Sequence, residues 1–209
     1  MLEYISFFSL RTHGIIKGIP FTEIIYVHSK IMIVDDEIAL IVSANINDRS
    51  LLGSRDSEVA VIIRDEYKVY SKMDGKQYLA ANFAQSLRIR LFKEHLGINL
   101  EITEFPEILL DPLNDRLFNV MKKIANTNTI LYREIFNCYP DDKVQKFSDL
   151  AKLYFSNSYH DNLATSLKIE KYFSYKDKIK GNLVEFPLNF LKQEYLNRTY
   201  FCKEIIGPI

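Results

Sequence analysis

The sequence predicts an α/β fold in which short strands come first and helices follow. Leucine and phenylalanine recur at every fourth position between residues 77 and 96, which is the spacing of one helix face. The 209 residues show no internal repeat, so we expect one domain over 1–209, with a core at 1–100 and a helical, loop-rich extension at 101–209. Before the helix, turn-forming residues separate three segments rich in β-branched residues, at 23–34, 38–42 and 58–63.

The first two strands should flank a loop. Residues 2–10 are aromatic and β-branched, and we expect them to form a strand. Residues 13–20 contain two glycines and a proline, which predicts a loop. The segment 23–34 has apolar residues at both odd and even positions, and this pattern indicates a strand that is buried on both faces.

Two further strands should follow a tight turn. Asp35-Asp36-Glu37 is expected to form the turn, and residues 38–42 and 58–63 are expected to form the strands. Residues 45–55, which lie between these strands, are polar and small. They predict a loop with room for one helical turn.

The rest of the chain is predicted to be mainly helical. The helix over 77–96 should end at Gly97, and Asp111-Pro112 should begin a second helix. Residues 138–180 predict loops and short helices, and residues 181–187 a last strand or extended arm. The second helix should bury Leu117, Val120, Met121 and Ile124. A solvated helix face is expected for the basic residues of the first helix, Arg88, Arg90 and Lys93.

Charge and targeting signals limit the possible functions. Lysine and arginine number 27 together, as do aspartate and glutamate, and this balance argues against a dominant nucleic-acid-binding surface. The start Met1-Leu2-Glu3 lacks the basic residues of a signal peptide, and no apolar run approaches the roughly 20 residues that span a bilayer. Cys138 and Cys202 follow no metal or redox spacing. We therefore expect a cytoplasmic protein that meets membranes only at their surface.

One set of polar residues interrupts the apolar strands, and it occurs only once in the chain. His28 and Lys30 are two positions apart, so a strand would project both side chains from one face. Ser43 and Asn45 have the same spacing at the end of the next strand, where they can point into one pocket. Glu58 begins the third strand.

This set contains the groups that cleavage of a phosphodiester requires. Lys30, Ser43 and Asn45 can stabilise the charge that develops on phosphoryl oxygens. The imidazole of His28 can attack phosphorus or protonate a leaving oxygen near neutral pH, because its ordinary pKa is about 6.5. Glu58 can select the tautomer of that imidazole. No cluster of metal-ligand residues is apparent, so no metal or other cofactor is expected.

A purely structural interpretation competes with the catalytic one. A His-x-Lys with an aspartate five residues later, here Asp35, often arises by chance, and Asp35 has the parity expected of a residue that fixes the backbone. His13, His95 and His160 lack comparable neighbours and are expected to be structural. A catalytic site is favoured because five functional groups follow consecutive strands in the most apolar part of the chain.

The pattern His28-x-Lys30-x-x-x-x-Asp35 followed by Ser43-x-Asn45 resembles the HKD signature of the phospholipase D superfamily. The stretches EIIYVHSKIMIVDD, SANINDRSLLGSRDSEVAV and GNLVEFPLNFL are similar to the second catalytic half of eukaryotic phosphatidylcholine-hydrolysing phospholipase D. The likeness covers nearly the whole chain. It implies an α/β/α sandwich that forms one half of a duplicated, bilobal fold, with the active site between the halves.

The resemblance also implies a role for each residue of the set. A histidine of the first half would form a phosphohistidine intermediate, while His28 would protonate the leaving alcohol and then activate water. Lys30, Ser43 and Asn45 would bind the substrate phosphate, with no metal required. The implied catalytic set is His28, Lys30, Asp35 and Glu58, in which Glu58 orients His28 and Asp35 is mainly structural.

The sequence departs from the family pattern in three ways, and the first determines the expected partners. Because the chain holds one HKD pattern, the second histidine would come from another polypeptide, either a second copy in a homodimer or a first-half HKD polypeptide. Val42 stands where the family has glycine, and its β-branched side chain is expected to crowd the site. The chain ends at Gly207-Pro208-Ile209, before the usual tail of the family, as expected of a fragment.

Three functions are consistent with these residues. The first is hydrolysis of phosphatidylcholine to phosphatidate and choline by an enzyme that associates peripherally with membranes. The second is a catalytically inactive remnant that binds lipid or a partner, which predicts an exposed apolar face where the missing half would dock. The third is an HKD nuclease, which the zero net charge and the lipase-like flanking sequences disfavour.

Overall fold

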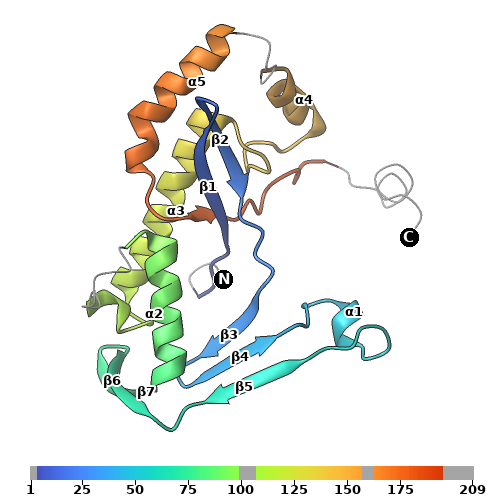
Figure 1. Ribbon diagram of the computed structural model, residues 1–209. Helices are drawn as coiled ribbons and strands as arrows, with labels where there is room; N and C mark the ends of the chain where they lie inside the picture. The colour runs from blue at the N-terminus through green and yellow to red at the C-terminus, as the bar shows by residue number, and fades with distance from the viewer. Residues whose placement is uncertain (1–3, 99–106, 157–161, 195–209) are drawn as a thin grey trace.

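The computed structural model describes residues 4–98, 107–156 and 162–194. Helices and sheets are mixed, as the sequence predicts, and the paired strands in these residues are antiparallel. One sheet has the order β2-β1-β8, from Ile19–Ile24, Phe8–Ile16 and Leu183–Glu185. The other has the order β3-β4-β5, from Lys30–Val34, Ile38–Val42 and Ala60–Arg64. The β3-β4-β5 sheet lies at one end of the molecule, whereas the β2-β1-β8 sheet lies nearer its middle, beside helix α3, Asp115–Phe136 (Figure 1).

The β3-β4-β5 sheet carries the sequence-predicted site. The strand at 38–42 and the turn before it are confirmed, since the Glu37 amide donates to the Val34 carbonyl at 2.9 Å. The single strand predicted over 23–34 is wrong, because residues 25–29 between β2 and β3 are irregular. This break has a physical reason: β2 pairs with β1, whereas β3 pairs with β4 in the other sheet.

The loop predicted at 13–20 is a β-hairpin. Strand β1 continues to Ile16, and the chain reverses at Lys17 and Gly18, which both have positive φ angles, 51° and 80°. Gly18 adopts this conformation without strain. Pro20 is accommodated because β2 is the edge strand of its sheet.

A second hairpin, which the sequence analysis did not predict, precedes the first long helix. Strands β6 (Lys68–Met73) and β7 (Lys76–Ala81) join through Asp74 and Gly75, which both have positive φ. Helix α2 therefore spans Asn82–Leu96 rather than beginning at residue 77. It ends at Gly97 in the left-handed conformation, as predicted.

Helix α2 crosses one face of the β3-β4-β5 sheet (Figure 1). Ala39 of the sheet is fully buried against Ala81 and Ala84, and the small side chains allow close packing of helix on sheet. Ile33 and Ile63 complete this contact from the neighbouring strands. The same helix thus fixes the positions of all three strands that carry the site.

The opposite face of the sheet is apolar but exposed within the described residues. Register places Met32, Leu40 and Ile62 side by side on that face, and Met32 and Ile62 are 54% and 61% exposed. Val34 on the same face is also exposed. The expectation that this strand is buried on both faces is therefore wrong, because no residue of β3 is buried and Ile33, on the face towards α2, is only partly buried. We call Met32, Val34, Leu40 and Ile62 the open face.

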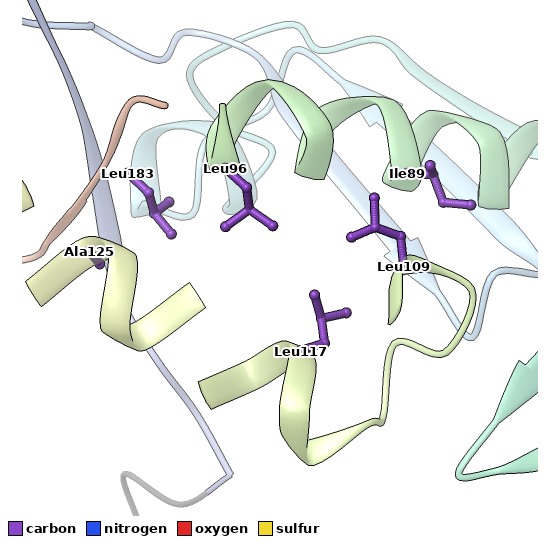
Figure 2. Packing of buried hydrophobic residues seen from close by; sticks show 6 residues of the cluster. All are labelled: Ile89, Leu96, Leu109, Leu117, Ala125 and Leu183. Atoms are coloured by element: carbon purple, nitrogen blue, oxygen red, sulfur yellow. The ribbon is translucent and has the colours of Figure 1, made fainter. Parts of the chain in front are cut away.

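The main core lies between α2, α3 and β8 (Figure 2). Helix α3 spans Asp115–Phe136, and its first turn is capped by the Asn114 side chain, which accepts a hydrogen bond from the Arg116 amide at 2.8 Å. Leu117 is fully buried, as predicted, and Met121 and Ile124 are partly buried beside it. The cluster that Figure 2 labels consists of Ile89, Leu96, Leu109, Leu117, Ala125 and Leu183.

The prediction that Asp111-Pro112 begins the second helix is wrong. The Asp111 carboxylate is buried and accepts hydrogen bonds from the amides of Asp74, Gly75 and Leu113, at 2.7–3.1 Å. These donors belong mostly to the β6-β7 turn, so Asp111 fastens that hairpin to the segment before α3. Its oxygens are thereby satisfied without capping a helix.

Two predicted surface cations of α2 are in fact buried. Arg88 and Lys93 are only 6% and 4% exposed, whereas Arg90 is exposed as expected. Arg88 pairs with Asp36, which lies in the turn between β3 and β4. Arg88 follows Ala84 by one helical turn and lies on the buried face of α2, where the Asp36 carboxylate neutralises its charge.

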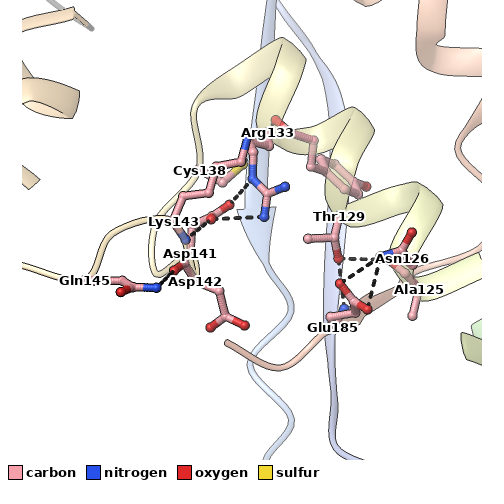
Figure 3. Close-up of polar contacts among 11 residues, drawn as sticks. Ala125, Asn126, Thr129, Arg133, Cys138, Asp141, Asp142, Lys143, Gln145 and Glu185 are labelled. Atoms are coloured by element: carbon pink, nitrogen blue, oxygen red, sulfur yellow. Dashed lines mark hydrogen bonds and ion pairs between the residues drawn. The ribbon is translucent and has the colours of Figure 1, made fainter. Parts of the chain in front are cut away.

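Polar contacts fasten α3 to strand β8 and to the segment that follows α3 (Figure 3). Arg133 of α3 makes a two-pronged pair with Asp141 at 2.6 and 3.0 Å, and the Glu185 carboxylate accepts from Asn126. Helices α4 (Phe147–Ser156) and α5 (Asn162–Tyr175) follow, as predicted for 138–180. Strand β8 confirms the strand predicted at 181–187.

Candidate functional site

His28 lies in the irregular stretch between the two sheets, where its side chain is exposed. Its ring is stacked on the ring of Tyr26, with centroids 6.2 Å apart and planes inclined by 27°. Alternation along an extended chain accounts for this contact, because residues two positions apart share a side. Tyr26 is not among the site residues expected from the sequence, although its spacing of two from His28 is the signal that identifies it.

Lys30 is the first residue of β3. Its ammonium group donates a 2.6 Å hydrogen bond to the backbone carbonyl oxygen of His28. This contact holds the ammonium group against the backbone of His28. In the register of the sheet, Lys30 stands beside Val42 of β4, which stands beside Ala60 of β5.

Ser43 and Glu58 close the end of the β4-β5 pair. The Ser43 hydroxyl donates to the Glu58 carboxylate and accepts from the Val59 amide at 2.9 Å, and the Ser43 amide donates to the Val59 carbonyl at 3.0 Å. These bonds fix the carboxylate next to the strand that bears Lys30. Within residues 4–98, Glu58 thus bonds Ser43 rather than the His28 ring.

The electrostatics of Glu58 keep it ionised at neutral pH. The hydrogen bond from Ser43 is the largest cause that lowers the pKa of Glu58 below its ordinary value. The Ser50 hydroxyl, which is buried, also lowers this pKa, although its geometry falls short of a hydrogen bond. The positive charge of Lys30 acts in the same direction. A carboxylate of this kind suits the stabilisation of a nearby cation.

A short helix holds the loop that carries Asn45. Helix α1 spans Asp48–Leu51, and the Asn47 side chain caps it by accepting from the Ser50 amide at 3.0 Å. The Asn47 amide donates to the Asn45 carbonyl at 2.9 Å, which leaves the Asn45 side chain exposed next to the end of β4. The helical turn allowed for in the 45–55 loop is confirmed.

Asp35 lies apart from the other site residues. It occupies the turn at the far end of β3, with a φ of 51°, and its side chain is exposed. Five residues of extended chain, about 16 Å, separate it from Lys30. The structure thus joins Ser43 to Glu58 and Lys30 to the backbone of His28, with the charge of Lys30 acting on Glu58. The His28 ring itself contacts Tyr26, and Asp35 lies apart at the other end of β3.

The other histidines have different surroundings. His13 Nδ1 lies 3.1 Å from the Tyr172 hydroxyl, and burial lowers the pKa of His13. His95, on α2, also has a pKa lowered by burial. His160 and Cys202 lie outside the described residues, whereas Cys138 is a half-buried free thiol.

Metal-ligand clusters and membrane-spanning helices were sought in the same residues. Within 4–98, 107–156 and 162–194, no three His, Cys, Asp or Glu side chains form a group that could hold a metal ion. No helix in those ranges is both long and apolar enough to cross a bilayer.

The sequence matches known proteins along its whole length. It is 43% identical over 209 residues to phospholipase D1 of Mus musculus, 41% identical to phospholipase D2 of Bos taurus and 40% identical to phospholipase D zeta 1 of Arabidopsis thaliana. These matches cover 99–100% of the chain but only 19–21% of each relative, so the chain spans about a fifth of their length. The sequence model of the phospholipase D family matches residues 21–148, which include every residue of the candidate site. The chain belongs to the phospholipase D family.

Proposed function

We propose that this chain is one catalytic half of a phospholipase D that hydrolyses phosphatidylcholine to phosphatidate and choline. The observation that supports this most directly is that Lys30, Ser43 and Glu58 lie at one end of the β3-β4-β5 sheet, where Lys30 bonds the backbone of His28. These groups supply an acid–base, a fixed positive charge and a hydroxyl on neighbouring strands. Phosphoryl transfer without a metal requires such a set.

The chemistry follows from the positions of these groups. A phosphate drawn to the site would take the Lys30 ammonium away from the His28 carbonyl, while Ser43 and Asn45 offer further hydrogen bonds to the phosphoryl oxygens. His28 would protonate the oxygen of the departing choline as the histidine of the first half attacks phosphorus. It would then remove a proton from the water that releases phosphatidate from that first-half histidine.

Glu58 would act through His28. Its lowered pKa means that it carries a negative charge at neutral pH, and this charge would stabilise the imidazolium form of His28. To contact the ring, the carboxylate would exchange its Ser43 hydrogen bond for one to imidazole. We infer that this exchange accompanies assembly of the complete active site.

A partner polypeptide is needed for this reaction, and the open face supports its presence. Met32, Val34 and Ile62 expose apolar side chains on the face of the sheet that α2 does not cover. Covering that face would complete the α/β/α sandwich and remove the side chains from water. A first-half HKD polypeptide or a second copy of the chain would do this. The assembled enzyme would act on lipid at a membrane surface.

Co-expression with a first-half HKD polypeptide tests the function. We expect choline release from phosphatidylcholine vesicles by the complex, and its loss in His28→Ala with the complex still assembled, as judged by mass in solution. Ser29→Ala is the matched control, because Ser29 is the exposed neighbour of His28 and has no proposed role. Choline release by the chain alone, together with its mass in solution, tests whether a homodimer is the active form.

The alternatives correspond to distinct outcomes of this experiment. A stable complex without choline release would favour the inactive, partner-binding remnant, for which the open face is also suited. Cleavage of plasmid DNA without lipid turnover would favour the nuclease. Choline release that His28→Ala leaves unchanged would refute the proposed mechanism.

A further inference from the structure

Three side chains at every second position of the chain form a row at the site. The Tyr26 ring lies against the His28 ring, and the Lys30 ammonium group bonds the backbone carbonyl of His28. About 13 Å of extended chain separates the first from the last. The row thus places an aromatic ring, an acid–base and a cation in order.

The same order occurs in the proposed substrate. The choline head group has a quaternary ammonium, then two carbons, then the ester oxygen, then the phosphate. If Lys30 binds the phosphate and His28 protonates the ester oxygen, the quaternary ammonium points along the row towards Tyr26. An aromatic face attracts a cation within about 6 Å of the ring centroid. The Tyr26 ring is 6.2 Å from that of His28, which is within reach of a group two carbons beyond the His28-bound oxygen.

We propose that Tyr26 binds the head group and selects a quaternary ammonium over a primary one. This inference rests on the proposed function, which it extends to substrate specificity. A quaternary ammonium carries no N–H and is poorly hydrated, so it loses little hydration when it contacts an aromatic face. A primary ammonium is strongly hydrated, so the same contact stabilises it less.

The exposure of Tyr26 supports a binding role over a packing role. Tyr26 is 84% exposed, so one side of its ring contacts His28 while most of its surface is open to a ligand. Burial of a tyrosine ring contributes to stability only when the ring leaves water, and this one does not. Glu58, the acidic residue at the end of the sheet, is hydrogen-bonded to Ser43.

Binding of soluble head groups tests the inference without turnover. The chain is titrated with phosphocholine and, separately, with phosphoethanolamine, and the His28 ring signals are followed by NMR. We expect Tyr26→Leu to weaken phosphocholine binding by about 2- to 30-fold. Its effect on phosphoethanolamine should be much smaller. Tyr26→Phe keeps the aromatic face and should bind as the parent does.

Tyr70→Leu is a matched control, because Tyr70 is also 84% exposed but lies on β6, away from His28. It should bind both ligands normally. Equal weakening of both ligands by Tyr26→Leu, unchanged phosphocholine binding in that variant, or absence of any His28 response in the parent would overturn the inference.

Turnover separates this inference from the proposed function. In the complex with a first-half polypeptide, Tyr26→Leu should reduce the preference for phosphatidylcholine over phosphatidylethanolamine. If His28-dependent hydrolysis occurs and Tyr26→Leu leaves that preference intact, the function stands and the role of Tyr26 fails. If no lipid is hydrolysed but phosphocholine binding still depends on Tyr26, the head-group role stands and the hydrolytic function fails.

Discussion

Arg88 and Asp36 form a two-pronged ion pair in the interior, with Nε–Oδ1 and Nη2–Oδ2 distances of 2.6 and 2.7 Å. A third guanidinium N–H donates to the Leu109 carbonyl at 2.8 Å. Asp36 is 2% exposed and has a φ of 51°, a conformation that is strained for a residue with a side chain. The pair therefore holds a strained turn, and with it the strand that begins at Lys30, against α2.

Removal of either partner should destabilise the chain strongly. Arg88→Met leaves the Asp36 carboxylate buried without its cation, and Asp36→Asn weakens the pair from the other side. We expect the free energy of unfolding in urea to fall by about 3–5 kcal/mol for Arg88→Met. The double variant should lose less than the sum of the two single losses.

The exposed pair between Lys72 and Glu107 is the control for this prediction. Lys72→Met should change the free energy of unfolding by less than about 1 kcal/mol, because water already screens that pair. Similar losses for Arg88→Met and Lys72→Met would show that burial of the Arg88–Asp36 pair has no special effect.

Two glycines permit the end of α2 to touch the segment before β8. Gly97 and Gly181 both have positive φ, and a Cβ on Gly97 would lie 2.9 Å from the Gly181 Cα. Gly97→Ala should therefore cost more than the roughly 1–2 kcal/mol of a left-handed conformation alone. Thermal unfolding of Gly53→Ala gives the reference, because Gly53 has the same conformation with nothing within 4 Å. If Gly97→Ala and Gly53→Ala lowered the stability equally, the close approach of Gly97 to Gly181 would not restrict the side chain at position 97.

The Ser43–Glu58 hydrogen bond should make the chain less stable in acid. The folded state lowers the pKa of Glu58, chiefly through Ser43, so the unfolded chain takes up this proton first as the pH falls. The stabilisation is complete above the ordinary pKa of 4.5 and is lost as the pH drops through the lower folded value.

Ser43→Ala should raise the pKa of Glu58 towards 4.5 and reduce this acid dependence. Carbon-13 NMR of the Glu58 carboxyl group measures the pKa directly. Ser54→Ala, an exposed change in the same loop, should leave it unaltered. An unchanged pKa in Ser43→Ala would assign the lowering to Ser50 and Lys30 instead.

Val42 should limit the room available to Lys30. Its side chain shares a sheet face with Lys30 and Ala60, its direct neighbours in register. Val42→Gly should lower the free energy of unfolding by about 1 kcal/mol, because glycine favours a strand less than valine does. It should also raise choline release by the complex, with Val42→Ala intermediate. Equal rates of choline release for the parent, Val42→Ala and Val42→Gly would show that Val42 does not crowd the site.

The parts of the fold that follow from local chemistry were predictable. The apolar run at Ile38–Val42 and the turn residues before it define a strand, and Gly97 ends α2 because glycine suits the left-handed cap. The predicted contact of Glu58 with His28 is replaced by a hydrogen bond to Ser43, which lies on the adjacent strand. Asp74-Gly75 was also a strong hairpin signal, but helical periodicity concealed it.

The predictions from the sequence were wrong where contacts between residues far apart in the chain determine the structure. No local pattern reveals that Arg88 meets Asp36, which lies 52 positions earlier, or that Asp111 serves the turn at Asp74. The irregular stretch around His28 likewise depends on β2 and β3 joining different sheets. Such contacts require the tertiary structure, because the sequence near each residue is compatible with a solvated or capping role.

Met32 and Ile62 stand in water with side chains typical of a protein interior. A polar replacement at either position should make the isolated chain easier to purify, because it reduces the exposed apolar surface through which copies of the chain would aggregate. In the cell the same replacement should be harmful, since it removes what an assembling partner would bury. Laboratory screens for soluble variants would therefore enrich the very changes that natural selection rejects.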